Sequence, residues 1–396
     1  MFDVVVVGGR CAGAPVAMLA AKAGLRVLLL DRARFPSDTV STHLIHQPGV
    51  ALLARWGVLD AVVATGCPPI ESAGYRLAGT TLRGRSEAVD GQAAAYAPRR
   101  YLLDEILADA AVSAGAEFVD RSTVVGLLRD EDGAVRGVRY RRGDALVEAS
   151  ASLVVGADGM RSTVARLAGA PTVVEDPTMT CVYYAYWRGL PAEFALYEEP
   201  GRFVGTIPTN DGLTVVAAYF PQVDFPKVRR DARAAYVTNI GDTVPGLAAV
   251  RVDDERFDRL HGFGAQRNFF RQAAGRGWVL TGDAAHHKDS ITARGISDAF
   301  VQAELLARQV LPAVTDPRAL RDSLAAYAEL RDDALAESYY TTLSVARLEV
   351  RDDRVELLRG ISGDQRMVDQ YFSVVSGARS VEDVFARHVP MLSPLH

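Results

Sequence analysis

The hydrophobic pattern of the first 31 residues is that of a strand, a helix and a second strand. Residues 2–7 (FDVVVV) are mostly apolar and β-branched, which is typical of a parallel strand buried on both faces. Residues 12–23 consist mainly of strong helix formers and are followed by Gly24, a helix stop. Residues 26–30 (RVLLL) form the second apolar run. The pattern predicts a βαβ unit.

The pattern then changes twice along the chain. Residues 71–97 read as short strands, and residues 122–150 alternate apolar and polar positions around two turns, which predicts a β-meander. A separate apolar strand, LVVGADG, follows the meander. After Pro171 the chain becomes rich in Tyr, Val, Phe and Thr, which predicts an antiparallel sheet over 178–220.

A strand of the first type, WVLTGDAAH, returns near residue 278, and helical patterns follow it to the end. This order predicts an α/β fold in which a Rossmann-like domain is interrupted by a mixed or antiparallel β-sheet domain. We place the nucleotide-binding domain at 1–70, 98–172 and 262–325, and the β-rich substrate domain at 71–97 and 173–261. The C-terminal helical region is 326–396, and its pattern is typical of packing or of a homodimer contact.

Composition and charge exclude several functions. The chain has 396 residues, of which 49% are hydrophobic, and its net charge of −5 gives no field that would attract nucleic acid. No apolar run approaches the roughly 18 residues of a membrane span, and no basic segment precedes an apolar one at the N-terminus. Cys11, Cys67 and Cys181 are widely spaced and form no metal-binding pattern. We expect a cytoplasmic protein with buried thiols and no bound metal.

The glycine-rich turn after the first strand indicates a dinucleotide site. Gly8 gives the backbone freedom for a tight turn, Gly13 lets the helix lie close to the strand, and the helix N-terminus favours a pyrophosphate. Asp31 lies 18 positions after Gly13, close to the spacing of an acid that binds a ribose hydroxyl. The second glycine of the usual G-x-G-x-x-G turn is replaced by Arg10. Its guanidinium is suited to a phosphate, and equally to solvent or a local carboxylate.

Two further motifs have the form of an apolar strand that ends in glycine and aspartate. Asp158-Gly159 ends one strand, and Gly282-Asp283 ends another. A carboxylate at a strand end suits a ribose or ribityl hydroxyl, although either motif alone is also compatible with a capped strand-to-helix turn. Gly295 opens a helix whose N–H groups would stabilise negative charge on a flavin. Together the three motifs are specific.

With these motifs in this order, residues 1–345 resemble the p-hydroxybenzoate hydroxylase-type flavoprotein monooxygenases and their relatives, the geranylgeranyl reductases and flavin-dependent halogenases. The resemblance implies FAD, with the first motif on its ADP half and Asp283 on its ribityl chain. It implies that Asp158 and Gly159 contribute to FAD and NAD(P)H binding, and that an arginine at a helix start contacts FAD. The predicted cofactor-binding residues are Gly8, Gly9, Arg10, Cys11, Ala12, Gly13, Asp31, Arg32, Arg99, Arg100, Asp158, Gly159, Gly282, Asp283, Arg294, Gly295 and Ile296.

The resemblance also implies a reaction. NADH or NADPH reduces FAD, and the reduced flavin reacts with O2 to a C4a-hydroperoxide that oxygenates a small aromatic or specialised-metabolite substrate. The sequence departs from the family at Ser290 and Thr292, where many members have proline and glycine. This departure leaves open a geranylgeranyl-reductase-like reduction of double bonds. A halogenase is disfavoured because residues 186–191 (YWRGLP) do not match the W-x-W-x-I-P motif, and a non-catalytic flavin-binding protein is a further alternative.

The remaining candidates are acid–base and substrate residues. His43, His46 and His286 are candidates for proton transfer, although a histidine in such a loop also commonly holds it together. Aromatic residues of the β-rich block suit an apolar substrate, and each of them is also suited to the core. The predicted substrate-pocket residues are Tyr184, Tyr186, Phe203 and Tyr219.

Overall fold

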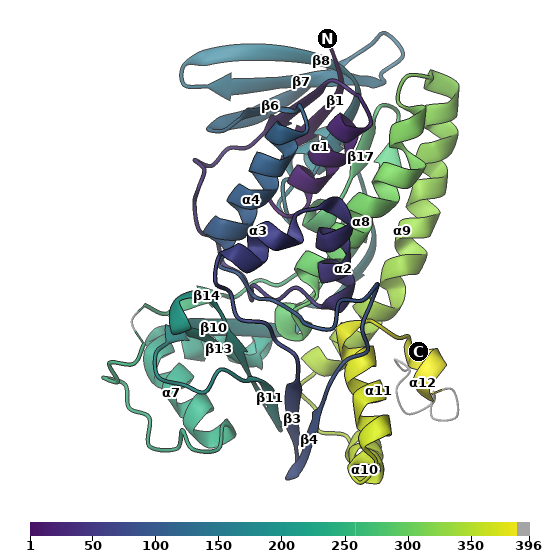
Figure 1. Cartoon of the computed structure of the whole chain (residues 1–396). Coiled ribbons are helices and arrows are strands. Elements are labelled where there is room, and N and C mark those ends of the chain that lie inside the picture. The colour runs from purple at the N-terminus through teal and green to yellow at the C-terminus, as the bar shows by residue number, and fades with distance from the viewer. Residues whose placement is uncertain (258, 386–396) are drawn as a thin grey trace.

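The computed structural model describes residues 1–257 and 259–385. Figure 1 shows the first sheet with its helices in the upper half of the view, the second sheet in the lower half, and the long helix α9 (Pro317–Ala346) along the right side of the upper half. Residue 258, in the predicted substrate domain, and residues 386–396, in the predicted C-terminal region, lie outside the described part. No helix among the described residues is long and apolar enough to cross a membrane.

The first sheet contains the predicted βαβ unit. Its parallel core has the order β17-β8-β1-β2-β5. Val4 and Val6 pack on one face and Val5 and Val7 on the other, and none of these four side chains is more than 6% exposed. The strands are β1 (Phe2–Val7), β2 (Val27–Leu30), β5 (Glu117–Val119), β8 (Ala145–Gly156) and β17 (Trp278–Leu280), with β16 (Ala274–Gly275) at the edge.

Helices cover one face of this sheet. α1 follows β1, α4 packs against α1, and α8 packs against α1 and α2. The helices that accompany this sheet are α1 (Gly13–Lys22), α2 (Gln47–Trp56), α3 (Leu59–Ala64), α4 (Arg100–Ser113), α5 (Thr163–Ala168) and α8 (Gly295–Gln309).

The β-meander covers the opposite face and corrects one expectation. β6 (Ser122–Arg129) and β7 (Val135–Arg142) pair antiparallel, and β7 pairs with β8. The strand that we predicted as separate, LVVGADG, is the second half of β8, which is a single strand of 12 residues. Residues 145–156 (ALVEASASLVVG) contain no glycine, proline, asparagine or aspartate before the final glycine, and no turn intervenes.

The second sheet has seven strands in the order β14-β10-β13-β12-β11-β3-β4. All neighbours pair antiparallel except β3 and β11, which are parallel. The sheet therefore joins segment 71–97 to segment 173–261. Its strands are β3 (Ala73–Leu77), β4 (Thr80–Gly84), β10 (Thr180–Trp187), β11 (Phe194–Glu199), β12 (Arg202–Pro208), β13 (Thr214–Pro221) and β14 (His261–Phe263). β9 (Thr172–Asp176), β15 (Asn268–Arg271) and β18 (His286–His287) form a third, small sheet.

Helices cover both faces of the second sheet. α6 (Phe225–Val228) and α7 (Ala232–Thr243) pack on one face, where Trp187 and Tyr236 belong to one apolar cluster. The C-terminal helices α10 (Asp352–Ile361), α11 (Gln365–Ser376) and α12 (Val381–Phe385) pack on the other face. α9 (Pro317–Ala346) precedes them, so the boundary that we placed between residues 325 and 326 falls inside a helix.

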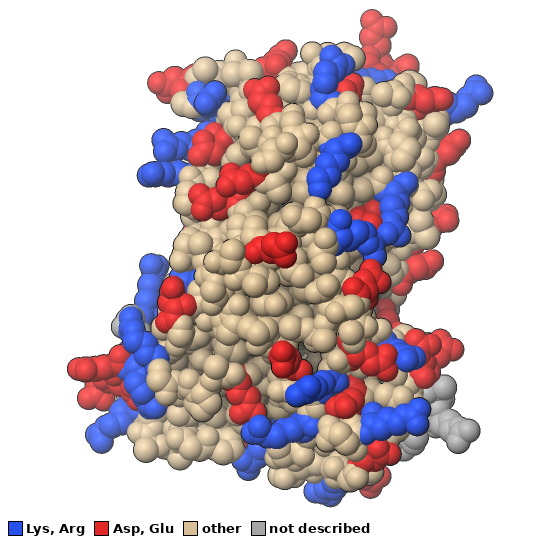
Figure 2. All heavy atoms as spheres, viewed as in Figure 1, with Lys and Arg blue, Asp and Glu red and all other residues tan. Residues whose placement is uncertain are grey.

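These observations confirm the predicted α/β fold with an interrupted Rossmann-like domain. The three cysteines are free and buried, as the sequence predicts. Figure 2 shows charges of both signs interspersed on one face of the molecule, with few of them across its middle.

Candidate active site

The turn between β1 and α1 has the geometry of a phosphate cradle. Gly8 has φ +108°, and a Cβ there would lie 2.3 Å from the carbonyl oxygen of Ala157. A Cβ on Gly13 would lie 1.9 Å from the carbonyl oxygen of Gly8, so both positions require glycine. The backbone N–H groups of Cys11, Ala12 and Gly13 have no hydrogen-bond partner within the described residues. The turn therefore offers free donors at the positive end of a helix, as a pyrophosphate requires.

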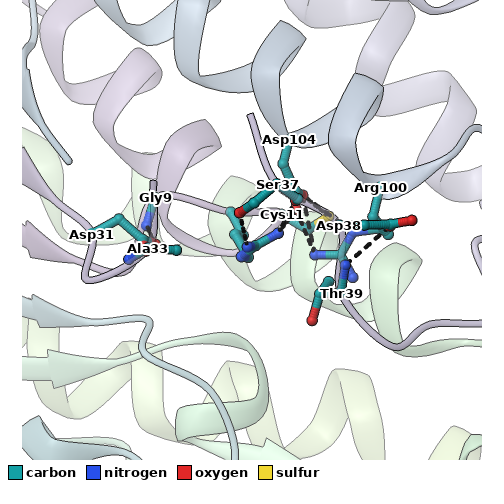
Figure 3. A network of polar contacts seen from close by, with 10 residues as sticks. Gly9, Cys11, Asp31, Ala33, Ser37, Asp38, Thr39, Arg100 and Asp104 are labelled. Carbon is teal, nitrogen blue, oxygen red and sulfur yellow. Dashed lines mark hydrogen bonds and ion pairs between the residues drawn. The ribbon is translucent and has the colours of Figure 1, made fainter. Parts of the chain in front are cut away.

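Asp31 holds this turn to the end of β2. Its Oδ2 accepts a hydrogen bond from the Gly9 N–H at 2.7 Å, and its Oδ1 accepts one from the Ala33 N–H at 2.7 Å (Figure 3). The side chain is buried, whereas the neighbouring Arg32 is exposed. The predicted ribose-binding acid thus also fixes the conformation of the turn.

Arg10 binds a local carboxylate, which was one of the two alternatives from the sequence. Its Nη1 lies 2.5 Å from Oδ2 of Asp104 on α4. Its guanidinium also donates to the carbonyl and hydroxyl oxygens of Ser37. The Cys11 thiol donates to Oδ1 of Asp104 at 3.2 Å, and burial raises the pKa of this thiol, so it stays neutral. Figure 3 shows this network around Asp104.

The two arginines at the start of α4 point to different partners. Arg100 forms a forked contact with Asp104 at 3.0 and 3.2 Å. Burial alone would lower its pKa, but the charges of Asp104 and Asp283 raise it above its ordinary value. Arg99 pairs with Asp38 at 2.7 Å, and its guanidinium lies 3.9 Å from the centre of the Tyr186 ring.

Asp158 caps a helix. Its Oδ1 accepts the Ser162 hydroxyl at 2.5 Å, and its Oδ2 accepts the Thr163 N–H at 2.6 Å, at the start of α5. Burial raises its pKa above the ordinary value although these bonds oppose the shift. Gly159 follows with φ +80° and open space around its Cα. The Asp158 side chain is therefore occupied by the strand-to-helix turn that we considered from the sequence.

The Gly282-Asp283 turn packs directly on the glycine-rich turn. Gly282 has φ +58°, and a Cβ there would lie 2.5 Å from the Cβ of Ala12. Asp283 is exposed and has no hydrogen-bond partner in the part of the chain that the structure describes. Arg100 lies near enough for the Asp283 charge to raise its pKa. The turn thus brings an unpaired carboxylate to the start of α1 and α4.

The start of α8 lies in the same region. α8 packs against α1 and against the Gly282 turn. The N–H groups of Gly295, Ile296 and Ser297 have no partner among the described residues. The glycine cradle, the free carboxylate of Asp283 and these donors fit the phosphates, the ribityl hydroxyls and the polar ring edge of FAD.

The loop before α8 is held by both the second sheet and α9. The Tyr219 hydroxyl lies 3.0 Å from both oxygens of Ser290, and the Thr292 hydroxyl lies 2.7 Å from that of Thr342. Ala293 has φ +53°, a left-handed conformation that favours glycine. The loop therefore has a backbone conformation that favours glycine at Ala293, one position after Thr292.

A cavity of about 400 Å³ lies beside this loop. Its walls are the inner face of the second sheet, helices α9, α11 and α12, and residues 291–294. The sheet contributes mostly apolar side chains, namely Phe194, Leu196, Phe203, Ile207, Ala217 and Tyr219. Two of the four predicted substrate residues, Phe203 and Tyr219, line this cavity, whereas Tyr184 and Tyr186 are not part of its lining.

Tyr186 instead packs against His43, and Tyr184 packs against Tyr186 and His261. The Tyr186 hydroxyl lies 2.6 Å from Nε2 of His43, and the two rings stack with centroids 5.7 Å apart. His43 has φ +64° and is fully buried, and its Nδ1 has no partner among the described residues. The Tyr186 hydroxyl can donate to Nε2 or accept from it, so this hydrogen bond forms in either tautomer of the neutral ring. Burial lowers the pKa of His43 to about 3, which keeps the ring neutral.

The other two predicted histidines differ in position. His46 lines the cavity, and its Nε2 donates to the carbonyl oxygen of Thr292 at 3.3 Å. Burial lowers its pKa to about 3. His286 packs against the rings of Phe270 and Tyr339, with centroid distances of 4.4 and 5.6 Å, and is not part of the cavity lining. No group of three or more potential metal ligands occurs in the described ranges.

Sequence reasoning missed the polar end of the cavity. Arg354 on α10 donates to Oε1 of Glu198 at 2.8 Å and contacts the Tyr75 hydroxyl. Tyr75, Arg354 and Tyr371 line the cavity. The available signal for this polar end was Arg354, which directly precedes the partly apolar segment VELL.

Comparisons with known proteins agree with this geometry. The FAD binding domain family matches residues 1–338. A digeranylgeranylglycerophospholipid reductase of Methanothrix thermoacetophila is 27% identical over 379 residues, 91% of this chain and 92% of the relative. A 6-methylpretetramide 4-monooxygenase of Streptomyces rimosus is 29% identical over 320 residues, 76% of this chain and 73% of the relative.

Solved structures show the same fold at lower identity. A geranylgeranyl bacteriochlorophyll reductase-like protein from Thermoplasma acidophilum is 20% identical to this chain. The match has a TM-score of 0.77 and covers 99% of this chain and 98% of the other. The predicted resemblance is thereby confirmed. The chain belongs to the FAD binding domain family of flavoprotein oxidoreductases, which its three glycine-bearing motifs predict.

Proposed function

We propose that this protein is an FAD-dependent monooxygenase that uses NADH or NADPH and O2 to oxygenate a small aromatic or specialised-metabolite substrate. The observation that carries the proposal is the position of the apolar cavity. It is bounded by residues 291–294, directly before the α8 N-terminus, where the resemblance places the flavin. A substrate in this cavity would therefore lie next to the reactive part of the cofactor.

The residues of the chain hold the cofactor in a defined orientation. When bound, FAD supplies hydride acceptance from the nicotinamide and the reaction with oxygen. The free N–H groups of the β1–α1 turn would bind its pyrophosphate, and Asp283 would bind the ribityl hydroxyls. The free N–H groups of the α8 N-terminus would stabilise negative charge on its ring.

The cavity walls offer a substrate a largely apolar surface. Phe203, Ile207 and Tyr219 present apolar surface from the sheet, and the C-terminal helices close the opposite side. His46 is neutral in this wall and keeps its proton on Nε2, where it bonds Thr292. It therefore stabilises the loop, and its other ring nitrogen is suited to accept a hydrogen bond from a substrate hydroxyl.

A reductase that saturates double bonds is the second candidate. The relative that covers 91% of this chain is named as a reductase, and an apolar cavity of about 400 Å³ also suits a hydrocarbon chain. The loop next to the predicted flavin position has Ser290 and Thr292 where many oxygenases have proline and glycine. A halogenase and a non-catalytic flavin protein have less support.

The test is stopped-flow spectroscopy of the FAD-loaded protein. NADH or NADPH is added without oxygen to bleach the flavin, and the reduced protein is then mixed with aerated buffer. A monooxygenase gives a transient oxygen adduct before the oxidised spectrum returns. A reduced flavin that persists in air and is reoxidised by a polyene contradicts the proposal and supports the reductase.

A further inference from the structure

Arg294 is a cation in the cavity wall that makes no hydrogen bond to a described residue. It is the N-cap residue of α8 and lines the cavity. Its side chain is 17% exposed, and its Nε is buried without a partner. A largely buried guanidinium that makes no hydrogen bond to a counter-charge is stabilised when an anionic ligand supplies one. The position of Arg294 therefore points to an anionic ligand.

The nearest carboxylate does not neutralise Arg294. Asp298 Oδ1 lies 3.8 Å from its Nε, beyond hydrogen-bond distance. Asp298 already forms a buried ion pair with Lys288, and its Oδ2 accepts the Ser338 hydroxyl at 3.2 Å. Lys288 and Arg294 thus share the Asp298 carboxylate, and the hydrogen-bonded ion pair is the one with Lys288.

The other arginines of the cavity lining each have a carboxylate of their own. Arg354 pairs with Glu198 at 2.8 Å, Arg351 pairs with Asp353, and Arg379 pairs with Glu87 at 2.8 Å. The acids of the lining, Asp333, Glu337 and Asp383, are exposed on α9 and α12. Arg294 is therefore the arginine of the described lining that is left for a ligand.

The end of α11 makes room for this guanidinium. Gly377 ends the helix with φ +79°, and a Cβ there would lie 2.2 Å from Nη2 of Arg294. The guanidinium is thus packed over a glycine. Next to it, the free N–H groups of Gly295 and Ile296 add positive potential. A planar guanidinium beside a helix N-terminus suits a carboxylate.

We propose that the cavity takes an aromatic carboxylate and that Arg294 binds its carboxyl group. This inference rests on the proposed function, because it assumes that the cavity is the substrate site. It differs from our prediction that Arg294 binds FAD. The apolar walls would enclose the aromatic part, and the carboxylate would pair with Arg294.

The test uses two ligands of the same shape and different charge, 2-naphthoate and 2-naphthamide. Their dissociation constants are measured by equilibrium dialysis against the FAD-loaded protein. We expect 2-naphthoate to bind about tenfold more tightly, as one charged hydrogen-bonded contact would give. Arg294→Gln should remove this preference and leave the affinity for 2-naphthamide within about twofold. Arg308→Gln, at the other end of α8, is the matched control and should change neither value.

A second variant locates the binding. Gly205 lines the cavity, and a Cβ there meets Leu196 at an ordinary 3.6 Å. Gly205→Leu should weaken both ligands because it fills the cavity. Equal affinity for the two ligands in the unmodified protein, or failure of both to bind, overturns the inference. Loss of FAD from Arg294→Gln also overturns it and returns Arg294 to the cofactor. None of these results depends on the oxygen reaction, which tests the proposed function separately.

Discussion

Arg10 in the β1–α1 turn and Asp104 on α4 form an ion pair, with Nη1 2.5 Å from Oδ2. The Asp104 side chain is 1% exposed and also holds Arg100, whereas that of Arg10 is 23% exposed. The residue that replaces the expected second glycine therefore ties the glycine-rich turn to the helix beside it. The turn is stabilised by a side-chain contact, and its N–H groups stay free for a ligand.

Loss of the Asp104 carboxylate should be costly. Asp104→Asn leaves two arginines without their counter-charge, so we expect the free energy of unfolding to fall by about 3 kcal/mol. Arg10→Met leaves the Arg100–Asp104 pair in place and should cost about 1 kcal/mol. Urea unfolding of the two variants measures the difference. Equal losses would show that Asp104 serves Arg10 alone.

Asp283 should be needed for the cofactor and not for the fold. Because its exposed carboxylate makes no hydrogen bond within the described residues, Asp283→Ala removes no internal contact of this kind. We expect the flavin content of the purified protein to fall while the melting temperature of the apoprotein stays the same. Asp322→Ala, an exposed acid on α9, is the control and should retain flavin. Normal flavin content in Asp283→Ala would mean that the carboxylate does not face the cofactor.

Ala293 should store backbone strain. Its φ of +53° is unfavourable for a residue with a Cβ, so Ala293→Gly should raise the free energy of unfolding by about 0.5 kcal/mol. Ala307→Gly, inside α8, should lower it by about 1 kcal/mol because glycine weakens a helix. Chemical denaturation of both variants shows whether each substitution raises or lowers the free energy of unfolding. A destabilising Ala293→Gly would contradict this view of the loop.

Asp289 should make stability fall as pH rises. Burial raises its pKa from 3.8 to about 6, against hydrogen bonds from Thr180 and Ile291. Between these values the folded protein holds a proton that the unfolded chain releases, so stability declines through this window and stays lower above it. Asp289→Asn has no such charge and should be more stable than the unmodified protein at pH 8, by about 1 to 3 kcal/mol.

The comparison is repeated near pH 4, at the lower end of this window, where the folded side chain is neutral in both forms and the difference should be much smaller. Asp322→Asn, at an exposed position, should show no such change. A constant difference between pH 4 and pH 8 would assign the effect to packing.

The parts of the fold that the sequence predicts correctly are those determined by residues close together in the chain. Residues 2–7 are apolar on both faces because the strand is buried on both faces, and Gly24 ends a helix through local backbone geometry. The join of LVVGADG to the meander was missed because strand length depends on pairing with β1 and β17 and not only on local residues.

The contacts of the site were less predictable because they join distant segments. Arg10 and Asp104 are 94 positions apart, and no local pattern links a glycine-rich turn to an acid inside a later helix. One wall of the cavity was predicted, because Phe203 and Tyr219 lie on the second sheet. The other wall was missed, because it comes from C-terminal helices whose pattern we interpreted as packing or a dimer contact. Asp158 belongs to a motif that predicts a bound ligand, but its carboxylate accepts hydrogen bonds at the start of α5 and caps that helix.

The central claim is that the glycine-rich turn, the Gly282-Asp283 turn and the α8 N-terminus bind one FAD. The most direct measurement is the stoichiometry of FAD in the purified protein, after incubation with excess FAD and removal of the unbound cofactor. We expect a yellow protein with about one FAD per chain. A folded, colourless protein that takes up no FAD would contradict the account.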